Sequence, residues 1–271
     1  SQHQNFDYII ACDHGYEHAK KAGIKPHLII GDFDSITAET DTQLKKIAAK
    51  SKPVTENDCS YKIANDHPNE VEHSNDPVSR KTEKSQKEPE AGTRPQILPE
   101  PRSILPEPQQ IIRLPKMKED TDTLAALRIA IQKGATEVTL FCALGGRLDH
   151  LIANLQLGIF AATHDVKLKI WDEHTRVTFL GRPATNPTTP VNTAKFAPQP
   201  GFSFSVFAVT DTAREVTIAN ALYEVFETTL TSSFPIGVSN EWLPSTVANP
   251  NPEITVSVRE GVLAVVCSKL D

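Results

Sequence analysis

The stretch from residue 52 to 110 most limits how this chain can fold, because it offers very little to a hydrophobic core. Ten of the 20 prolines lie between Pro53 and Pro115, and Tyr61 is the only aromatic residue of the stretch. Burial of so few apolar side chains cannot offset the entropy that is lost when a backbone is ordered. We therefore interpret residues 52–110 as a disordered, proline- and charge-rich surface insertion, with a docking tether as the less favoured alternative.

The other residues of the 271-residue chain suffice for one large domain or two small ones. The formal net charge of −6 does not indicate a basic surface for nucleic acid or a membrane. No apolar run reaches the roughly 18 residues that cross a bilayer, and the first residues lack a signal-peptide layout. The four scattered cysteines have neither zinc-ligand spacing nor a disulfide framework. We expect a cytoplasmic protein that acts on small molecules.

The first 180 residues alternate between strand-like and helix-like segments. Short apolar runs such as FDYIIAC, HLIIG, IIRL and TEVTLFCAL are separated by segments with a helical period, such as DTLAALRIAIQKGA. This alternation predicts an α/β fold in which helices cover a mostly parallel sheet. We assign residues 1–180, with the insertion inside them, to an N-terminal α/β domain.

Residues 181–271 have a different pattern. Beyond Gly201 the apolar residues alternate with polar ones or are β-branched, as in FSFSVFAV, EVTIANA, YEVFETTL, EITVSV and GVLAVVC. A helical period of useful length is absent from this part of the sequence. The pattern predicts a C-terminal all-β sandwich of antiparallel strands.

Three acidic clusters occur where a strand ends or a helix begins: Asp13 in ACDHG, Asp32 and Asp34 in GDFDS, and Glu119, Asp120 and Asp122 in KEDTD. The carboxyl ends of parallel strands form one crevice, so we expect these acids to face each other. Asp32, Asp34 and Asp122 would form an all-oxygen site that suits Mg²⁺ and a polyphosphate. A cation would also relieve the repulsion among the acids.

Local structure offers an alternative explanation for each cluster. Asp120, Thr121 and Asp122 suit the N-cap and first turn of a helix, and for this cluster alone that explanation is the stronger one. Asp32 and Asp34 can bond to their own backbone in a turn. Support for a metal site therefore comes from the convergence of the clusters and not from any one of them.

A fourth cluster, ALGGRLDHLIAN, follows a predicted strand and opens a helix. Paired glycines let backbone N–H groups approach a phosphate, and the guanidinium of Arg147 can bind that phosphate through two N–H groups. Asp149 and His150 lie beside it, although a lone histidine such as His150 is more often a capping or packed residue than a catalyst.

Taken in order, DHG, IKPHLIIGDFDSI, KEDTDTLAAL and ALGGRLDHLIANL, followed by GVSNEW, resemble the thiamin pyrophosphokinase family. The resemblance covers about residues 6–50 and 111–180, matches the β region more loosely, and leaves the insertion without a counterpart. It implies transfer of a pyrophosphoryl group from ATP to thiamin, with Mg²⁺ as cofactor and thiamin diphosphate and AMP as products. It also implies a homodimer.

The resemblance further implies roles for particular residues. Asp32, Asp34 and Asp122 would hold Mg²⁺ and, together with Arg147, would form the catalytic set. The residues that would contact substrates are Asp13, Ser35, Thr121, Asp149, His150, Ser239 and Asn240. Ser239 and Asn240 match the motif beside the thiamin pocket, which in the family lies between subunits.

The sequence departs from the family pattern at His14, where a glycine is usual, and in lacking a strand that precedes the match to FDYIIAC. These departures keep open the alternative of a non-catalytic thiamin- or nucleotide-binding homologue. A second alternative, a Mg²⁺-dependent pyrophosphokinase or phosphohydrolase with another substrate, stays open because the sequence locates the thiamin pocket only loosely. No serine, cysteine or histidine has an obvious nucleophile arrangement, so the expected mechanism is direct in-line attack.

Overall fold

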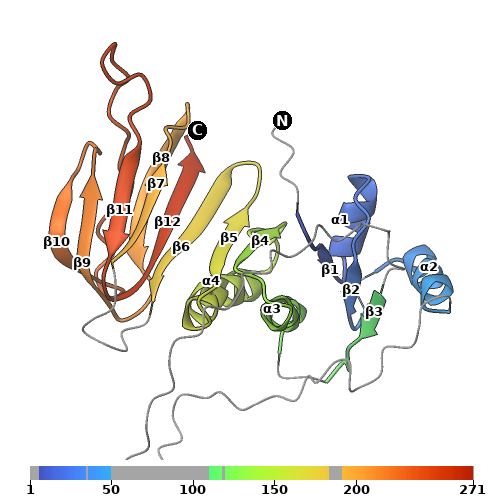
Figure 1. Ribbon diagram of the computed structural model, residues 1–271. Coiled ribbons are helices and arrows are strands. Elements are labelled where there is room, and N and C mark those ends of the chain that lie inside the picture. The colour runs from blue at the N-terminus through green and yellow to red at the C-terminus, as the bar shows by residue number, and fades with distance from the viewer. Residues whose placement is uncertain (1–5, 35, 50–109, 118–119, 183–190, 271) are drawn as a thin grey trace, which may run out of the picture.

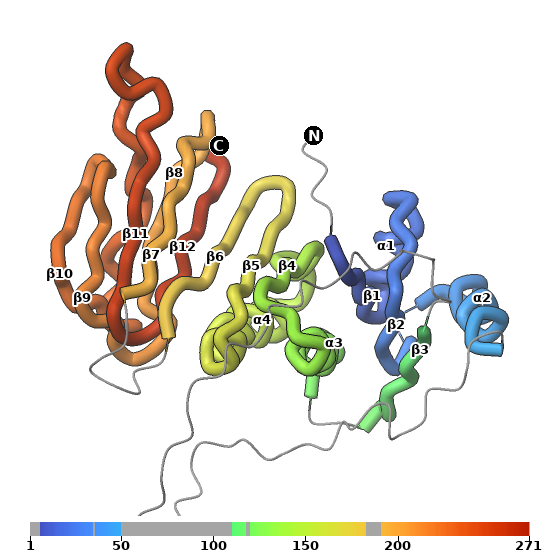
Figure 2. Tube along the Cα trace, in the orientation of Figure 1, coloured from blue at the N-terminus to red at the C-terminus, as the bar shows by residue number. Residues whose placement is uncertain are grey.

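The structure is a computed structural model that describes residues 6–34, 36–49, 110–117, 120–182 and 191–270. The expected insertion at 52–110 lies outside the described residues, except for Gln110, which begins a strand. Figures 1 and 2 show a small sheet with its helices at one end of the molecule and an all-β part at the other.

A three-stranded parallel sheet forms the first part of the fold. Its strands are β1 (Ile10–Cys12), β2 (Leu28–Gly31) and β3 (Gln110–Arg113), and β2 lies in the middle. The helices α1 (Gly15–Lys21) and α2 (Ala38–Ala48) pack with Ile29 on one face. On the other face, α3 (Asp122–Gln132) packs against Ile30. Burial on both faces explains why HLIIG is a continuous apolar run.

A five-stranded sheet in the order β4-β5-β6-β12-β8 forms the middle of the molecule. Its strands are β4 (Glu137–Phe141), β5 (Lys167–Trp171), β6 (Thr175–Arg182), β12 (Gly261–Lys269) and β8 (Phe202–Ala208). β4 and β5 are parallel, whereas the other pairs are antiparallel. The expected division after residue 180 falls inside β6, which pairs with both β5 and β12, and this boundary stays a prediction.

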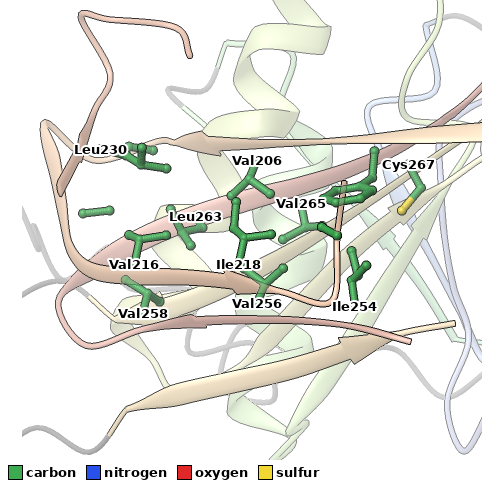
Figure 3. Close-up of a cluster of buried hydrophobic side chains, with 14 residues drawn as sticks. Val206, Val216, Ile218, Leu230, Ile254, Val256, Val258, Leu263, Val265 and Cys267 are labelled. Atoms are coloured by element: carbon green, nitrogen blue, oxygen red, sulfur yellow. The ribbon is translucent and has the colours of Figure 1, made fainter. Parts of the chain in front are cut away.

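The two faces of this sheet pack against different elements. The helix α4 (Leu148–Thr163) covers one face, where Leu157 contacts a core that includes Leu168 and Phe179. A four-stranded antiparallel sheet faces the other side, in the order β10 (Val225–Thr231), β9 (Thr212–Ala219), β11 (Ile254–Val258) and β7 (Asn192–Phe196). Figure 3 shows the core between the two sheets.

Alternation along β12 shows how one strand serves both cores. Leu263, Val265 and Cys267 face the sandwich core, whereas Val262 and Ala264 face α4. The structure thus confirms a mixed α/β fold. Within the described ranges, none of the helices is both long and apolar enough to cross a bilayer, and the expected cytoplasmic location stays a prediction.

Gly158 of α4 provides a test of the packing between this helix and β6. A Cβ atom at this position would lie 2.1 Å from Cδ1 of Phe179. We expect Gly158→Ala to lower the free energy of unfolding by about 1–3 kcal/mol, because overpacking outweighs the roughly 1 kcal/mol by which alanine favours a helix. Urea unfolding measures the change. The same substitution in a Phe179→Leu background should cost less, and an unchanged single variant would contradict this packing.

Candidate active site

Asp13 lies directly after β1 and connects three segments of the candidate site. Its backbone adopts a left-handed conformation, with φ of 43°. Its Oδ1 accepts a hydrogen bond of 3.1 Å from the backbone N–H of Phe33, in the turn after β2. Its carboxyl group also shares a hydrogen bond with that of Asp122, the first residue of α3. Asp13 therefore holds the end of β1, the turn after β2 and the start of α3 together.

Gly31 makes room for the Asp13 carboxyl group. A Cβ atom at position 31 would lie only 1.8 Å from Oδ1 of Asp13. Any larger residue would push this carboxyl group away from its partners, so the glycine of the GDFDS motif has a direct steric role.

The electrostatics of this cluster differ from those of exposed acids. The pKa of Asp13 is raised from 3.8 to about 7, first by burial and next by the hydrogen bond with Asp122. The charges of Asp122 and Asp32 add to the rise, since neighbouring carboxylates resist simultaneous ionisation. Burial also raises the pKa of the adjacent Cys12 thiol to about 12. Cys12 is therefore a neutral thiol at pH 7 and a poor nucleophile.

The Asp32–Asp34 turn carries the second acidic cluster. Phe33 in its centre has a φ of 61° and is buried, whereas Asp34 is exposed. The backbone N–H of Asp34 donates to Oδ1 of Asp32 at 3.1 Å, which is the turn bonding described above as an alternative to metal binding. Ser35 lies outside the described residues. After the turn, the N–H of Thr37, the N-cap of α2, donates a hydrogen bond of 3.0 Å to the side chain of Glu17 in α1.

The third cluster begins α3. Thr121 is the N-cap residue, and its hydroxyl oxygen accepts a hydrogen bond of 3.1 Å from the N–H of Leu124. The local capping explanation therefore applies to Thr121. Capping also places Asp122 in the first helical turn, next to Asp13.

The acidic residues of the site do not form a complete metal site, but they suit a cation that is shared with phosphate oxygens. Across the described ranges, no three His, Cys, Asp or Glu side chains are placed to hold a metal ion by themselves. The three predicted ligands Asp32, Asp34 and Asp122 do not form such a group, and their metal role stays a prediction. Mg²⁺ is commonly held by only one or two carboxylates together with phosphate oxygens. The Asp13–Asp122 pair, with the Asp32 charge beside it, fits this second arrangement in donor type and in charge.

The predicted phosphate-binding residues gather at the start of α4. Arg147 is the N-cap residue, and its Nη2 lies 2.5 Å from Oδ2 of Asp149. This hydrogen bond raises the pKa of Arg147 and lowers that of Asp149. The backbone N–H of His150 donates to Oδ1 of Asp149 at 3.0 Å. All three side chains are exposed, so they remain accessible to a ligand.

The residues predicted near thiamin take part in the internal structure of the sandwich. Asn240 is buried, and its Oδ1 accepts hydrogen bonds from the N–H groups of Tyr223 at 3.0 Å and Glu241 at 2.9 Å. Its Nδ2 donates to the carbonyl oxygen of Tyr223 at 2.8 Å. Trp242 packs edge-on against Phe204. Ser239 is exposed, with φ of 58°. Asn240 thus has a clear structural role.

Two residues near the Asp32–Asp34 turn could not be identified from sequence motifs. Arg113 ends β3 and contacts the Asp32–Asp34 turn, and Glu17 of α1 caps α2. Glu17 is buried, and hydrogen bonds from Thr37 and Thr40 lower its pKa to about 2. Its only signal in the sequence is an acid at a position that the helical pattern turns toward the sheet.

Carboxyl groups at the strand ends and a glycine-rich loop at a helix start define an α/β class of protein suited to phosphate chemistry. Residues 2–66 and 96–170, more than half of the chain, match the family model described as "Thiamin pyrophosphokinase, catalytic domain". The chain therefore belongs to the thiamin pyrophosphokinase family, a family of enzymes. The expectation that residues 52–110 have no counterpart in the family is therefore wrong for 52–66 and 96–110, which the family model matches, and only residues 67–95 are left unmatched.

Solved structures share this fold. The thiamine pyrophosphokinase of Bacillus subtilis has a TM-score of 0.62 at 18% identity, covering 96% of this chain and 86% of its own. The thiamin pyrophosphokinase of Geobacillus thermodenitrificans has a TM-score of 0.60 at 21% identity, covering 98% of this chain and 88% of its own. The thiamin pyrophosphokinase of Candida albicans has a TM-score of 0.52 at 14% identity, covering 100% of this chain and 87% of its own. No curated protein matches the sequence significantly.

The raised pKa of Asp13 predicts how stability depends on pH. Between its ordinary value of 3.8 and about 7, folded Asp13 holds a proton that the unfolded chain has lost. This group therefore makes the free energy of unfolding fall as the pH rises through that window. We expect the free energy of unfolding of Asp13→Asn, relative to that of wild type, to be higher at pH 8 than at pH 5. Urea unfolding in EDTA at the two pH values measures this difference. An equal difference between Asp13→Asn and wild type at both pH values would refute the shift.

The hydrogen bonds of Asn240 predict a loss of stability when they are removed. Asn240→Ala leaves the peptide groups of Tyr223 without their partner, so we expect a loss of about 1–3 kcal/mol in the free energy of unfolding. Ser239→Ala, the neighbouring control, should stay within about 0.5 kcal/mol. A stable Asn240→Ala variant with a raised KM for thiamin alone would instead indicate a pocket residue.

Proposed function

We propose that this chain catalyses the transfer of a pyrophosphoryl group from ATP to the primary hydroxyl of thiamin, in the presence of Mg²⁺. Thiamin diphosphate and AMP are the products. One observation carries the proposal: in a chain of this family, the carboxyl group of Asp13 lies between the turn after β2 and Asp122 of α3, with the charge of Asp32 nearby.

The proposed mechanism depends on positioning and charge neutralisation. Pyrophosphoryl transfer needs no covalent enzyme intermediate, so the thiamin hydroxyl attacks the β-phosphorus directly and AMP leaves. Mg²⁺, when bound, neutralises phosphate charge. Asp32, Asp34 and Asp122 would hold the cation, with Asp13 beside Asp122, and one carboxylate of this cluster accepts the proton of the hydroxyl. Arg147 is accessible and would neutralise charge on the phosphates.

The second part of the proposal concerns thiamin and a homodimer. We assign residues 1–180 to catalysis and the all-β residues 181–271 to thiamin binding, with Ser239 and Asn240 near the pocket. Apolar side chains remain exposed around β10 and the segment after it: Tyr223, Phe226, Phe234, Ile236 and Val238. Exposed apolar groups of this kind are typical of an interface. They support a homodimer that contacts through the sandwich.

Product analysis tests the proposed reaction. The full chain is incubated with ATP, thiamin and Mg²⁺, and the products are separated and quantified. We expect AMP and thiamin diphosphate in equal amounts. AMP or phosphate without thiamin diphosphate would indicate a phosphohydrolase or another acceptor, and binding of both substrates without turnover would indicate a non-catalytic homologue. Either outcome would contradict the proposal.

The metal role of the turn predicts the effect of Asp32→Asn. The substitution removes a charge from the site and no core volume, so we expect kcat to fall at least about 100-fold, or roughly 2.7 kcal/mol in the activation barrier. The melting temperature should hardly change. Asp211→Asn removes the same charge from an exposed loop and should keep full activity. An Asp32→Asn enzyme within a few-fold of wild type would refute the metal role.

A further inference from the structure

Arg113 is the last residue of β3 and emerges beside the Asp32–Asp34 turn. In the pairing of β2 with β3, Arg113 lies opposite Gly31, the residue before this turn. The backbone N–H of Leu114 donates to the carbonyl oxygen of Gly31 at 2.8 Å and fixes this register. The strand pairing therefore places the Arg113 side chain beside the turn.

The guanidinium group of Arg113 makes three separate contacts. Its Nη1 lies 3.4 Å from the backbone carbonyl oxygen of Asp32, to which it donates. Its central carbon lies 4.8 Å from the centre of the Phe33 ring. Its Nη2 donates to Oδ1 of Asp41, in the first turn of α2, at 3.1 Å. One planar side chain thus connects the turn to α2, which a lysine ammonium cannot reproduce.

The turn needs such external support because of its backbone conformation. Phe33 has a φ of 61°, which is unfavourable for an aromatic residue and persists only where its surroundings impose it. Asp13 holds the N–H of Phe33 from the side of β1. Arg113 holds the preceding carbonyl and the ring from the side of α2.

We propose that Arg113 is a positioning residue, which clamps the Asp32–Asp34 turn to α2 and thereby sets where the Asp32 carboxylate meets the divalent cation and phosphates of the substrate. The kinetic consequence rests on the proposed function, whereas the conformational one does not. The Arg113 and Asp41 side chains are 52% and 30% exposed. Their ion pair therefore adds little to overall stability, and its loss acts locally.

Lys45 supplies a matched control. It forms an ion pair of 2.7 Å with the same Asp41, four residues earlier in α2. Lys45→Ala removes a cation from Asp41 but leaves the contacts between Arg113 and the turn in place. Comparison with Arg113→Ala therefore separates the clamp from a general loss of positive charge.

Amide hydrogen exchange tests the conformational claim without reference to activity. In the full chain, Arg113→Ala should speed exchange of the Phe33 and Asp34 amides by at least about ten-fold, while the melting temperature stays within about 2 °C of wild type. Lys45→Ala should change exchange by less than about two-fold. Asp41→Asn removes the partner of Arg113 on α2 and should also speed exchange of the Phe33 and Asp34 amides. It serves as the test variant if Arg113→Ala does not fold. Unchanged exchange in the folded variants would overturn the proposal.

Kinetics test the consequence for the site. Arg113→Ala should raise the Mg²⁺ concentration for half-maximal rate and lower kcat about ten-fold, with the KM for thiamin unchanged. Full restoration by Arg113→Lys, or an equal loss in Lys45→Ala, would overturn the clamp in favour of charge alone. A wild-type chain that makes no thiamin diphosphate, combined with faster exchange in Arg113→Ala, would refute the proposed function but support the positioning role.

Discussion

The carboxyl group of Asp13 is the interaction on which the candidate site depends. It accepts the N–H of Phe33 and shares a hydrogen bond with Asp122, so it joins segments more than 100 residues apart in sequence. Gly31 leaves the space that this carboxyl group fills. These contacts connect the turn after β2 to the start of α3 through one side chain.

The fold keeps this arrangement fixed by burying elements on both faces. α3 packs against Ile30 through Ala125 and Ala126, while its Leu127 reaches the core under the five-stranded sheet. The helix that presents Asp122 is therefore held by both sheets. The five-stranded sheet in turn carries α4 on one face and the sandwich on the other. Packing thus connects the helix that carries Asp122 to the all-β part.

Periodicity and motifs in the sequence predict a large part of this structure. Continuous apolar runs identify buried strands such as β2 and β12. The position of Asp13, Asp32, Asp34 and Asp122 at element ends predicts that these acids come together, and the structure places Asp122 and Asp32 near Asp13 while Asp34 is exposed. The contacts of Arg113 could not be predicted, because they depend on the pairing of β3 with β2, and the strands are separated by residues 32–109 in the sequence. The bonding of Asn240 to Tyr223 also depends on distant pairing. The strand β7 lies in a proline-rich region without a strand pattern.

A crystal structure of the full chain with Mn²⁺, a non-hydrolysable ATP analogue and thiamin tests the central claim most directly. Mn²⁺ replaces Mg²⁺ at oxygen sites and can be located by its anomalous scattering. The account predicts Mn²⁺ bound directly to carboxylate oxygens of Asp32 and Asp122, together with the triphosphate. Cation and triphosphate bound away from Asp13, Asp32 and Asp122 would contradict it.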